Sequence, residues 1–393
     1  MKKLLLFLLF ICSVQFSISQ PSKISKAKFS PLGDIIAYTD GSDRNSNLNL
    51  YLMNHDELIK RIIPDSLHNL IVREFEFSPK GDVIAMLLTT KMITDLYVYM
   101  IKAKKIIRCT NSSELKNSDL GYKSWLQWCD NQSVIFLSKH SGISQQYIFD
   151  FSDMTLKSNG SSKGNEYFLT YSQKSQESYY IAVINNREPS VYRRKRASSI
   201  NTEISKDGKN HITPILSDKN NFLFYSVMPE ISPCIFDLNN SKFIKTKLPK
   251  LNVKIVGWSE SDSSLACIYS HYDSEENFAK TDFMTYNYFS HKKQIISKEI
   301  EPALGILCSP DGTKFVFSKS ISPYTVTQNV KKYNTESIQT FISDKKGVIL
   351  NYPLCGIAND WSNDNKTVLF TDGNNLVLLN VETGKLKSIL TEK

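Results

Sequence analysis

One short phrase recurs along this chain and limits its possible folds more than any other feature. Each copy joins an apolar strand end to Ser-Pro-x-Gly, and a second apolar run follows directly. Three copies are nearly identical, within residues 28–34, 75–82 and 307–313. Their defining residues are Ser30, Pro31 and Gly33; Ser78, Pro79 and Gly81; and Ser309, Pro310 and Gly312.

The chemistry of this phrase predicts a tight turn between two strands. Proline holds φ near −65°, which suits the second position of a turn. The glycine that follows tolerates a positive φ, as the later turn positions require. The flanking runs are rich in Ile, Val, Phe and Tyr, which favour strands. We therefore interpret each phrase as a β-hairpin.

Weaker copies of the phrase fill the intervals between the three clear ones. Aligned on the serine position, eight copies recur every 42–53 residues, and most are followed by two more strand-like runs. Four short strands per repeat and a period of about 40–50 residues are typical of β-propeller blades. The aligned residues are Ser30, Ser78, Cys129, Ser172, Ser217, Ser259, Ser309 and Ser362.

We accordingly predict an all-β chain that forms a single β-propeller of about eight four-stranded blades. Seven blades are an alternative count, and a β-sandwich or a solenoid is an alternative architecture. The first repeat begins soon after the N-terminal apolar run and the last ends near residue 393. The expected division is therefore a signal peptide at 1–19 and a propeller at 20–393.

The repeat resembles the PD40 (WD40-like) repeat of TolB-like β-propellers. The likeness rests on the Ser-Pro-x-Gly hairpin, the apolar strand after it, and an aromatic-aliphatic third strand such as Leu96-Tyr97-Val98-Tyr99. TolB-like proteins carry an N-terminal domain and six blades, so this chain departs from them and their Tol-system role is not implied. The resemblance implies a fold, and a fold does not define a function.

Propellers of dipeptidyl-peptidase-like proteins carry a similar repeat, often in eight blades, followed by an α/β-hydrolase domain. That domain would show a Gly-x-Ser-x-Gly elbow. The nearest string here, Gly257-Trp258-Ser259-Glu260-Ser261, lacks the second glycine and lies in a repeat hairpin. The sequence thus indicates a related propeller without the catalytic domain.

The N-terminus has the features of a secretory signal of bacterial type. Lys2 and Lys3 precede an apolar run from Leu4 to Val14, and Ser17-Ile18-Ser19 offers small residues for cleavage before Gln20. An uncleaved anchor, or a lipoprotein modified at Cys12, is an alternative. No second run is long enough to span a bilayer, which needs about 20 residues. We therefore expect a periplasmic or secreted protein with no transmembrane segment in its mature chain.

Composition and motifs narrow the function further. A formal charge of +9 is mild for 393 residues, and it does not predict nucleic-acid binding. Phosphate-binding glycine motifs and paired histidine ligands are absent from the sequence, so we predict no cofactor, no metal site and no assignable catalytic residue. Acidic residues from different blades could still meet at the centre of the ring, as glycoside chemistry requires.

The most distinctive local feature is the cationic run Arg193-Arg194-Lys195-Arg196. It is a candidate contact for an anionic partner, such as phosphorylated lipid headgroups or an acidic protein. The alternative is a charged edge strand that prevents unwanted sheet pairing.

The sequence thus favours a non-enzymatic function. The leading hypothesis is an exported propeller that binds a protein or envelope component as a scaffold or accessory subunit. The alternative is a propeller enzyme that acts on a glycan with an acidic site in its central funnel.

Overall fold

The computed structural model confirms the all-β prediction. The residues it describes are 24–42, 45–59, 61–64, 67, 70–89, 94–111, 126–139, 142–160, 163–185, 187–205, 209, 211–217, 219–228, 232–248, 253–259, 263–273, 278–300, 306–320, 325–327, 330–332, 338–350, 354, 356–372 and 375–390. They contain 33 strands and no helix. The predicted signal peptide, 1–19, lies outside the described residues. No helix of the described chain is long and apolar enough to cross a membrane.

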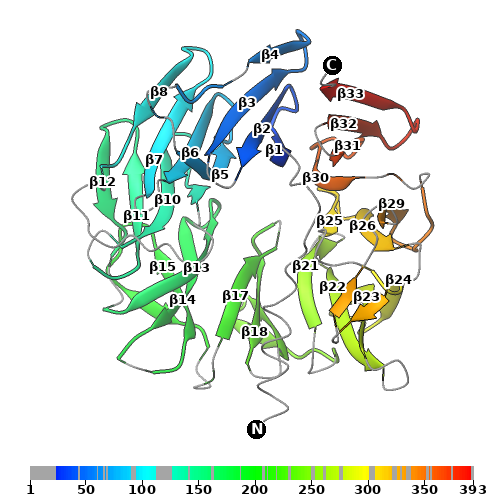
Figure 1. Cartoon of the computed structure of the whole chain (residues 1–393). Helices are drawn as coiled ribbons and strands as arrows, with labels where there is room; N and C mark the ends of the chain where they lie inside the picture. The colour runs from blue at the N-terminus through cyan, green and yellow to red at the C-terminus, as the bar shows by residue number, and fades with distance from the viewer. Residues whose placement is uncertain are drawn as a thin grey trace.

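The strands form eight successive sheets arranged in a ring, which confirms the propeller of eight blades (Figure 1). We number the blades I to VIII along the chain. Blades I to IV contain β1 (Ile24–Phe29), β2 (Ile35–Ser42), β3 (Asn45–Leu52) and β4 (Glu57–Ile59); β5 (Ile71–Phe77), β6 (Val83–Thr89), β7 (Thr94–Met100) and β8 (Lys105–Arg108); β9 (Leu126–Trp128), β10 (Ser133–Ser138), β11 (Gln145–Asp150) and β12 (Thr155–Ser158); and β13 (Asn165–Ser172), β14 (Glu177–Val183), β15 (Ser190–Lys195) and β16 (Asn201–Glu203).

The second half of the ring repeats this order with one variation. Blades V to VIII contain β17 (His211–Leu216), β18 (Phe222–Val227), β19 (Ser232–Asp237) and β20 (Lys242–Ile244); β21 (Val253–Ser259), β22 (Ser264–Asp273), β23 (Phe278–Asn287) and β24 (Lys293–Ser297); β25 (Ile306–Cys308), β26 (Lys314–Ser320) and β29 (Ile338–Asp344), with the hairpin β27 (Thr325–Thr327) and β28 (Val330–Lys332); and β30 (Ile357–Trp361), β31 (Thr367–Asp372), β32 (Asn375–Asn380) and β33 (Leu386–Leu390).

Each blade is an antiparallel meander whose first strand lies nearest the axis of the ring (Figure 1). Blade VII differs because the hairpin β27–β28 is inserted between its second and third strands. Among the described residues, blade VII also lacks a full outer strand. Two isolated β-bridges, Thr340–Leu354 and Ser343–Ile349, take the place of that fourth strand. Seven blades thus have four strands, and blade VII has three strands plus these bridges.

The repeated phrase forms the hairpin between the first and second strands of each blade. In the clearest copies the glycine N–H donates to the serine carbonyl three residues earlier, at 2.8–2.9 Å. Gly33, Gly81 and Gly312 have φ of +72°, +72° and +67°, a region that glycine occupies without strain. The serine hydroxyl also accepts the N–H that opens the second strand, at 3.2 Å in blade I and 2.9 Å in blade VII.

Apolar side chains fill the junctions between blades, so the core is distributed around the ring. The junction of blades I and II is the largest, with fourteen buried residues that include Phe75, Phe77 and Tyr97. Similar clusters occupy the other junctions. Burial of this area is the main favourable contribution to folding.

The ring closes between blades VIII and I without a shared strand. Ile36 and Tyr38 of blade I pack against Leu369 and Leu376 of blade VIII. Hydrogen bonds add to this packing, because the Phe29 N–H donates to Asp360 Oδ2 at 2.9 Å. Closure therefore depends on side chains of the same kind that join the other blades.

Candidate functional site

One position of the innermost strand recurs in all eight blades, two residues before the aligned serine. Strand register shows the equivalence: Lys28 pairs with Ala37, Glu76 with Ala85 and Leu307 with Val316, each the third residue of its second strand. We call these eight positions the axial ring. Its members are Lys28, Glu76, Gln127, Thr170, Ile215, Gly257, Leu307 and Asp360, all half-buried.

The axial ring is polar on one side and apolar on the other. Asp360, Lys28 and Glu76 lie on the successive blades VIII, I and II, whereas blades V to VII carry Ile215, Gly257 and Leu307 at this position. A Cβ on Gly257 would lie 2.7 Å from the sulfur of Cys308, so the next blade excludes a larger residue there. The eight repeats are therefore not equivalent in chemistry.

Several axial side chains bind the neighbouring blade. The Phe29 N–H donates to Asp360, and in the same way the Tyr171 N–H donates to Gln127 Oε1 at 2.6 Å. In both cases the donor is the residue just after the axial position of the next blade. The side chains of Asp360 and Gln127 thus help to hold adjacent blades together.

Lys28 and Glu76 form an ion pair between blades I and II. Each side chain is about one third exposed, at 32% and 33%. Burial opposes the charged form of Lys28, but the adjacent Glu76 carboxylate outweighs it and raises the pKa of Lys28. A second pair, Lys26 with Glu74 at 3.7 Å, joins the same two strands.

Asp360 is a perturbed carboxyl group of this region, and burial also raises the pKa of its neighbour Glu76. Burial raises the pKa of Asp360 to about 6, although backbone N–H donors and Lys28 act in the opposite direction. Its two oxygens accept from Phe29 N and from Trp361 N, both at 2.9 Å. A β-bulge between Ala358 and Asp360 precedes it, and bulges re-aim side chains in this way.

We call Lys26, Lys28, Glu74, Glu76 and Asp360 the charged arc. They come from β1, β5 and β30, which are the innermost strands of three adjacent blades (Figure 1). The two lysines and three carboxylates nearly balance in charge. Such an arrangement suits a polar or zwitterionic ligand that carries both signs of charge, and burial raises the pKa of two of its carboxyl groups, Glu76 and Asp360.

The structure buries one residue of the cationic run 193–196 completely. Arg194 and its ion-pair partner Glu166 are fully buried, with the Arg194 Nη2 and Glu166 Oε1 atoms 2.5 Å apart. The guanidinium also donates to Asn159 O and Asn201 Oδ1, and it lies over the ring of Tyr180 at 4.8 Å. Arg194 is therefore committed to contacts within the fold.

The other residues of the run differ from one another. Arg196 pairs with Asp130 of blade III at 2.6 Å, Arg193 is half-buried, and Lys195 is exposed. Arg193 to Lys195 lie at the end of β15, and Arg196 follows the strand. Because β15 has β14 and β16 on its two sides, the alternative interpretation as an edge strand is wrong. Contact with an anionic partner stays a prediction for Lys195 and Arg193.

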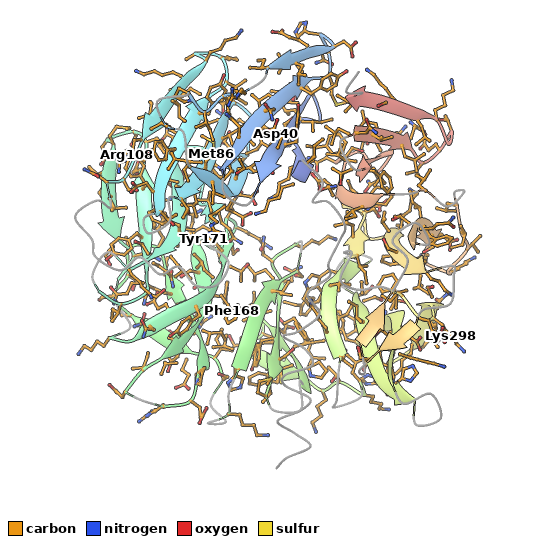
Figure 2. All side chains as sticks on the ribbon, viewed as in Figure 1. Asp40, Met86, Arg108, Phe168, Tyr171 and Lys298 are labelled. Carbon is orange, nitrogen blue, oxygen red and sulfur yellow. The ribbon has the colours of Figure 1, made fainter. Side chains whose placement is uncertain are left out.

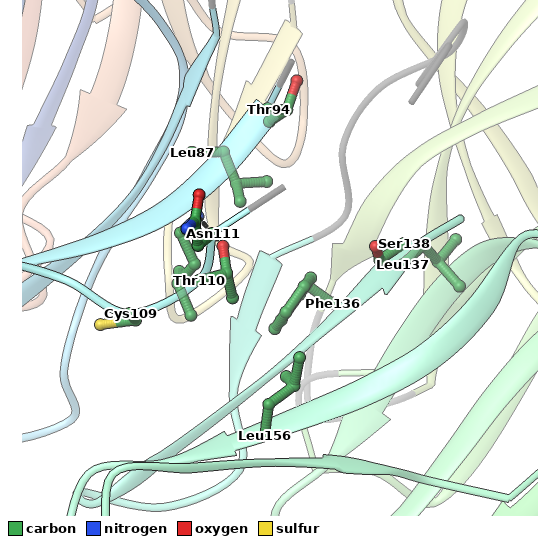
Figure 3. A pocket seen from close by; sticks show the side chains of 10 residues that line it. Leu87, Thr94, Cys109, Thr110, Asn111, Phe136, Leu137, Ser138 and Leu156 are labelled. Carbon is green, nitrogen blue, oxygen red and sulfur yellow. Dashed lines mark hydrogen bonds between the residues drawn. The ribbon is translucent and has the colours of Figure 1, made fainter. Parts of the chain in front are cut away.

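A small pocket of about 140 Å³ lies between blades II and III (Figure 3). Leu87, Leu96 and Phe136 contribute its apolar wall, and Thr94 and Thr110 contribute hydroxyl groups. Cys109 also lines it, and burial raises the pKa of this thiol to about 12, which makes it unreactive at neutral pH. A cavity of this size has room for a ligand no larger than a benzene ring.

The described residues contain no group of three or more His, Cys, Asp or Glu side chains placed to hold a metal ion. The hairpin residues Ser30, Pro31 and Gly33, with their counterparts at 78–81 and 309–312, lie in turns and have a structural role.

The sequence prediction named none of the charged arc. A signal was nevertheless present. Alignment of the eight repeats on the serine would have placed Lys28, Glu76 and Asp360 at one equivalent position facing the axis.

Comparison with known proteins agrees with the fold. The chain resembles an oligogalacturonate lyase in complex with manganese, at 10% identity, 94% and 98% coverage of the two chains and a TM-score of 0.57. It also resembles the dihydro-heme d1 dehydrogenase NirN, at 10% identity, 95% and 74% coverage and a TM-score of 0.56. At these identities the likeness shows the fold alone.

TolB from Acinetobacter baumannii is another similar structure, at 17% identity and a TM-score of 0.41. The match covers 56% of this chain and 53% of TolB, so it spans about half the length of each. No protein-family model and no curated protein matches the sequence. The fold of the described chain is an eight-bladed β-propeller, and TolB proteins are among its structural neighbours.

Proposed function

We propose that this protein is an exported, non-enzymatic β-propeller that binds a protein or another envelope component, and that the charged arc is its contact. One observation carries the proposal: five charged side chains from three blades meet near the axis. Four of them form inter-blade pairs whose side chains remain 24–41% exposed. Charges that stay in contact with solvent can exchange an internal partner for a ligand at low cost.

The position of the arc supports a binding role. Segments of all blades converge only around the axis of a propeller, so a ligand there meets several blades at once. Binding groups on rigid strands are held more precisely than those on loops. The apolar side of the axial ring, with Ile215 and Leu307, offers a second kind of contact to the same ligand.

The test is a pull-down from envelope extract with a charge-neutral double variant, Lys26→Gln with Glu74→Gln. The Lys26 Nζ and Glu74 Oε2 atoms are 3.7 Å apart, which is long for an ion pair, so loss of this pair should not unfold the protein. Its matched control is Lys157→Gln with Asp153→Asn, an exposed pair on blade III. We expect the arc variant to lose a partner that the control retains. Capture of the same partners by both folded variants would contradict the proposal.

Export belongs to this proposal and has its own test. Mass spectrometry of the mature protein should find an N-terminus near Gln20. An intact Met1 in the exported fraction would contradict cleavage, and a lipid-modified Cys12 would indicate a lipoprotein instead.

A glycan-active enzyme is the second candidate, and Asp360 is the observation that favours it. A carboxyl group with a pKa of about 6 can act as a general acid near neutral pH. Oligogalacturonate is the first substrate to test, because an oligogalacturonate lyase shares the fold. If the protein cleaves oligogalacturonate and the Asp360→Asn variant does not, the result would support the enzymatic function. If the protein does not cleave it, the binding function remains as the proposal.

A further inference from the structure

The perimeter of blades V to VII carries exposed lysines and exposed apolar side chains together. Three segments contribute: 242–248 with β20, 289–298 with β24, and 345–350 after β29. They contain eight lysines, all exposed, and no aspartate or glutamate. We call these three segments the basic perimeter. Lys298 marks it on the outer edge of the ring in Figure 2.

Exposed apolar groups are concentrated on the same surface. Among the described residues thirteen large apolar side chains are exposed, and six of them lie in these three short segments. Phe289 is 64% exposed, Val348 56% and Ile295 51%. Apolar groups at this density on an exposed surface mark interaction sites.

The three segments lie next to one another. The Lys247 N–H donates to the hydroxyl of Tyr286 at 2.8 Å, and the same hydroxyl bonds His291 Nδ1 at 2.8 Å, which joins the first segment to the second. Gly347 lies against the backbone of Ile296, because a Cβ there would be 2.9 Å from the Ile296 carbonyl oxygen. The second and third segments are therefore in contact.

We propose that the basic perimeter docks this protein on an anionic lipid surface. Lysines attract anionic headgroups, while Phe289, Ile295 and Val348 can enter the interface between headgroups and acyl chains. An acidic protein would match the charge but would not need so many exposed aliphatic groups. No ion pair of Lys292, Lys293 or Lys298 with a carboxylate is found among the described residues, and all three lysines are exposed. The proposal does not depend on the charged arc.

The test uses purified mature protein and sedimentation with vesicles. Vesicles of phosphatidylglycerol and phosphatidylcholine should bind it, vesicles of phosphatidylcholine alone should not, and added salt should weaken binding because exposed charges are screened. The variant Lys292→Gln, Lys293→Gln, Lys298→Gln should lose about 100-fold in affinity, since each lysine near such a surface contributes about fivefold.

A matched control lies on the opposite side of the ring. Lys102, Lys104 and Lys105 of blade II are also exposed, four blades away from blade VI. Their replacement by Gln removes the same charge and should leave vesicle binding nearly unchanged. Equal losses in the two triple variants, or no binding to anionic vesicles at all, would overturn the proposal.

The apolar contribution separates a lipid surface from an acidic protein. Phe289→Ser should weaken vesicle binding with an unchanged salt dependence, whereas Met100→Ser, at an exposed apolar site of blade II, should not weaken it. Unchanged binding after Phe289→Ser would show a purely electrostatic surface, which an acidic protein would use, and would also overturn the proposal. Circular dichroism and thermal unfolding confirm that each variant is folded.

Discussion

The junction of blades III and IV and the junction of blades I and II hold their charges in different ways. At III–IV the ion pair of Arg194 and Glu166 is fully buried. The apolar packing there is limited to two small clusters of six and three buried residues. At I–II fourteen buried apolar residues form a continuous core, and the pair of Lys28 and Glu76 stays in contact with solvent.

The difference follows from the cost of burying charge. A buried ion must be paired and hydrogen-bonded, because desolvation costs several kcal/mol per ion. Around Arg194 this requirement is met by Glu166, Asn159 and Asn201, and the Gln146 N–H also donates to Glu166 at 3.1 Å. Such a network has no capacity left for a ligand. The solvent-exposed pair of Lys28 and Glu76 at the I–II junction can still bind a ligand, and the charged arc is therefore the better candidate site.

The largest effect should come from breaking the buried pair. Glu166→Gln leaves the Arg194 guanidinium buried without a counter-charge, which should cost about 3–5 kcal/mol of unfolding free energy. Urea denaturation followed by intrinsic fluorescence measures this loss. The double variant Glu166→Leu with Arg194→Met should recover most of it, since an apolar pair removes the unpaired charge. If Glu166→Gln lowers the unfolding free energy by less than about 1 kcal/mol, the buried pair contributes no more than an exposed ion pair, and the prediction is wrong.

Asp360 should show a smaller effect that depends on pH. Because burial raises its pKa from 3.8 to about 6, the folded state binds this proton more tightly than the unfolded state. The stability it contributes is full below about pH 4 and is lost as pH rises through about 6. Asp360→Asn lacks this titration, so its stability relative to the wild type should rise from pH 4 to pH 8, by up to about 3 kcal/mol.

Thermal unfolding across this pH range checks the prediction. The Asp360→Asn variant also loses one backbone acceptor, but the cost of that loss does not change with pH, so the slope is the informative quantity. Parallel stability curves for the variant and the wild type would show that the Asp360 pKa is not raised by folding.

The pair at the I–II junction should contribute less. Glu76→Gln should change the unfolding free energy by at most about 1 kcal/mol, because both side chains are one third exposed, solvent screens their attraction, and burial disfavours the charged form of Glu76 and raises its pKa. Added salt should reduce the difference from the wild type. The exchange variant Lys28→Glu with Glu76→Lys keeps the pairing and serves as the control. A loss as large as that of Glu166→Gln would remove the contrast between the two junctions.

The smallest effect is expected for the pair of Asp153 and Lys157 on the turn and outer strand of blade III. Their side chains are 47% and 59% exposed. Asp153→Asn should leave the denaturation midpoint unchanged within error, as is common for exposed pairs. A clear shift of the midpoint would show that exposure does not rank these ion pairs.

Much of the fold could be predicted from the sequence because the signals for it are local. The turn chemistry of Ser-Pro-x-Gly acts within a few residues, and its recurrence every 42–53 residues is visible in the sequence. The eight blades and the hairpin positions follow from it. The inserted hairpin β27–β28 and the incomplete outer strand of blade VII carry no such repeated signal, and the sequence prediction missed both.

The sequence by itself determined the repeat, the strands and the number of blades, because these depend on neighbouring residues. Only the tertiary structure decided the role of each charge. Phe29 and its acceptor Asp360 are 331 residues apart, and Arg194 is buried by residues of two blades. The physical reason is that the energy of a charge depends on its solvent exposure and its partners, and in a ring those partners come from blades remote in sequence.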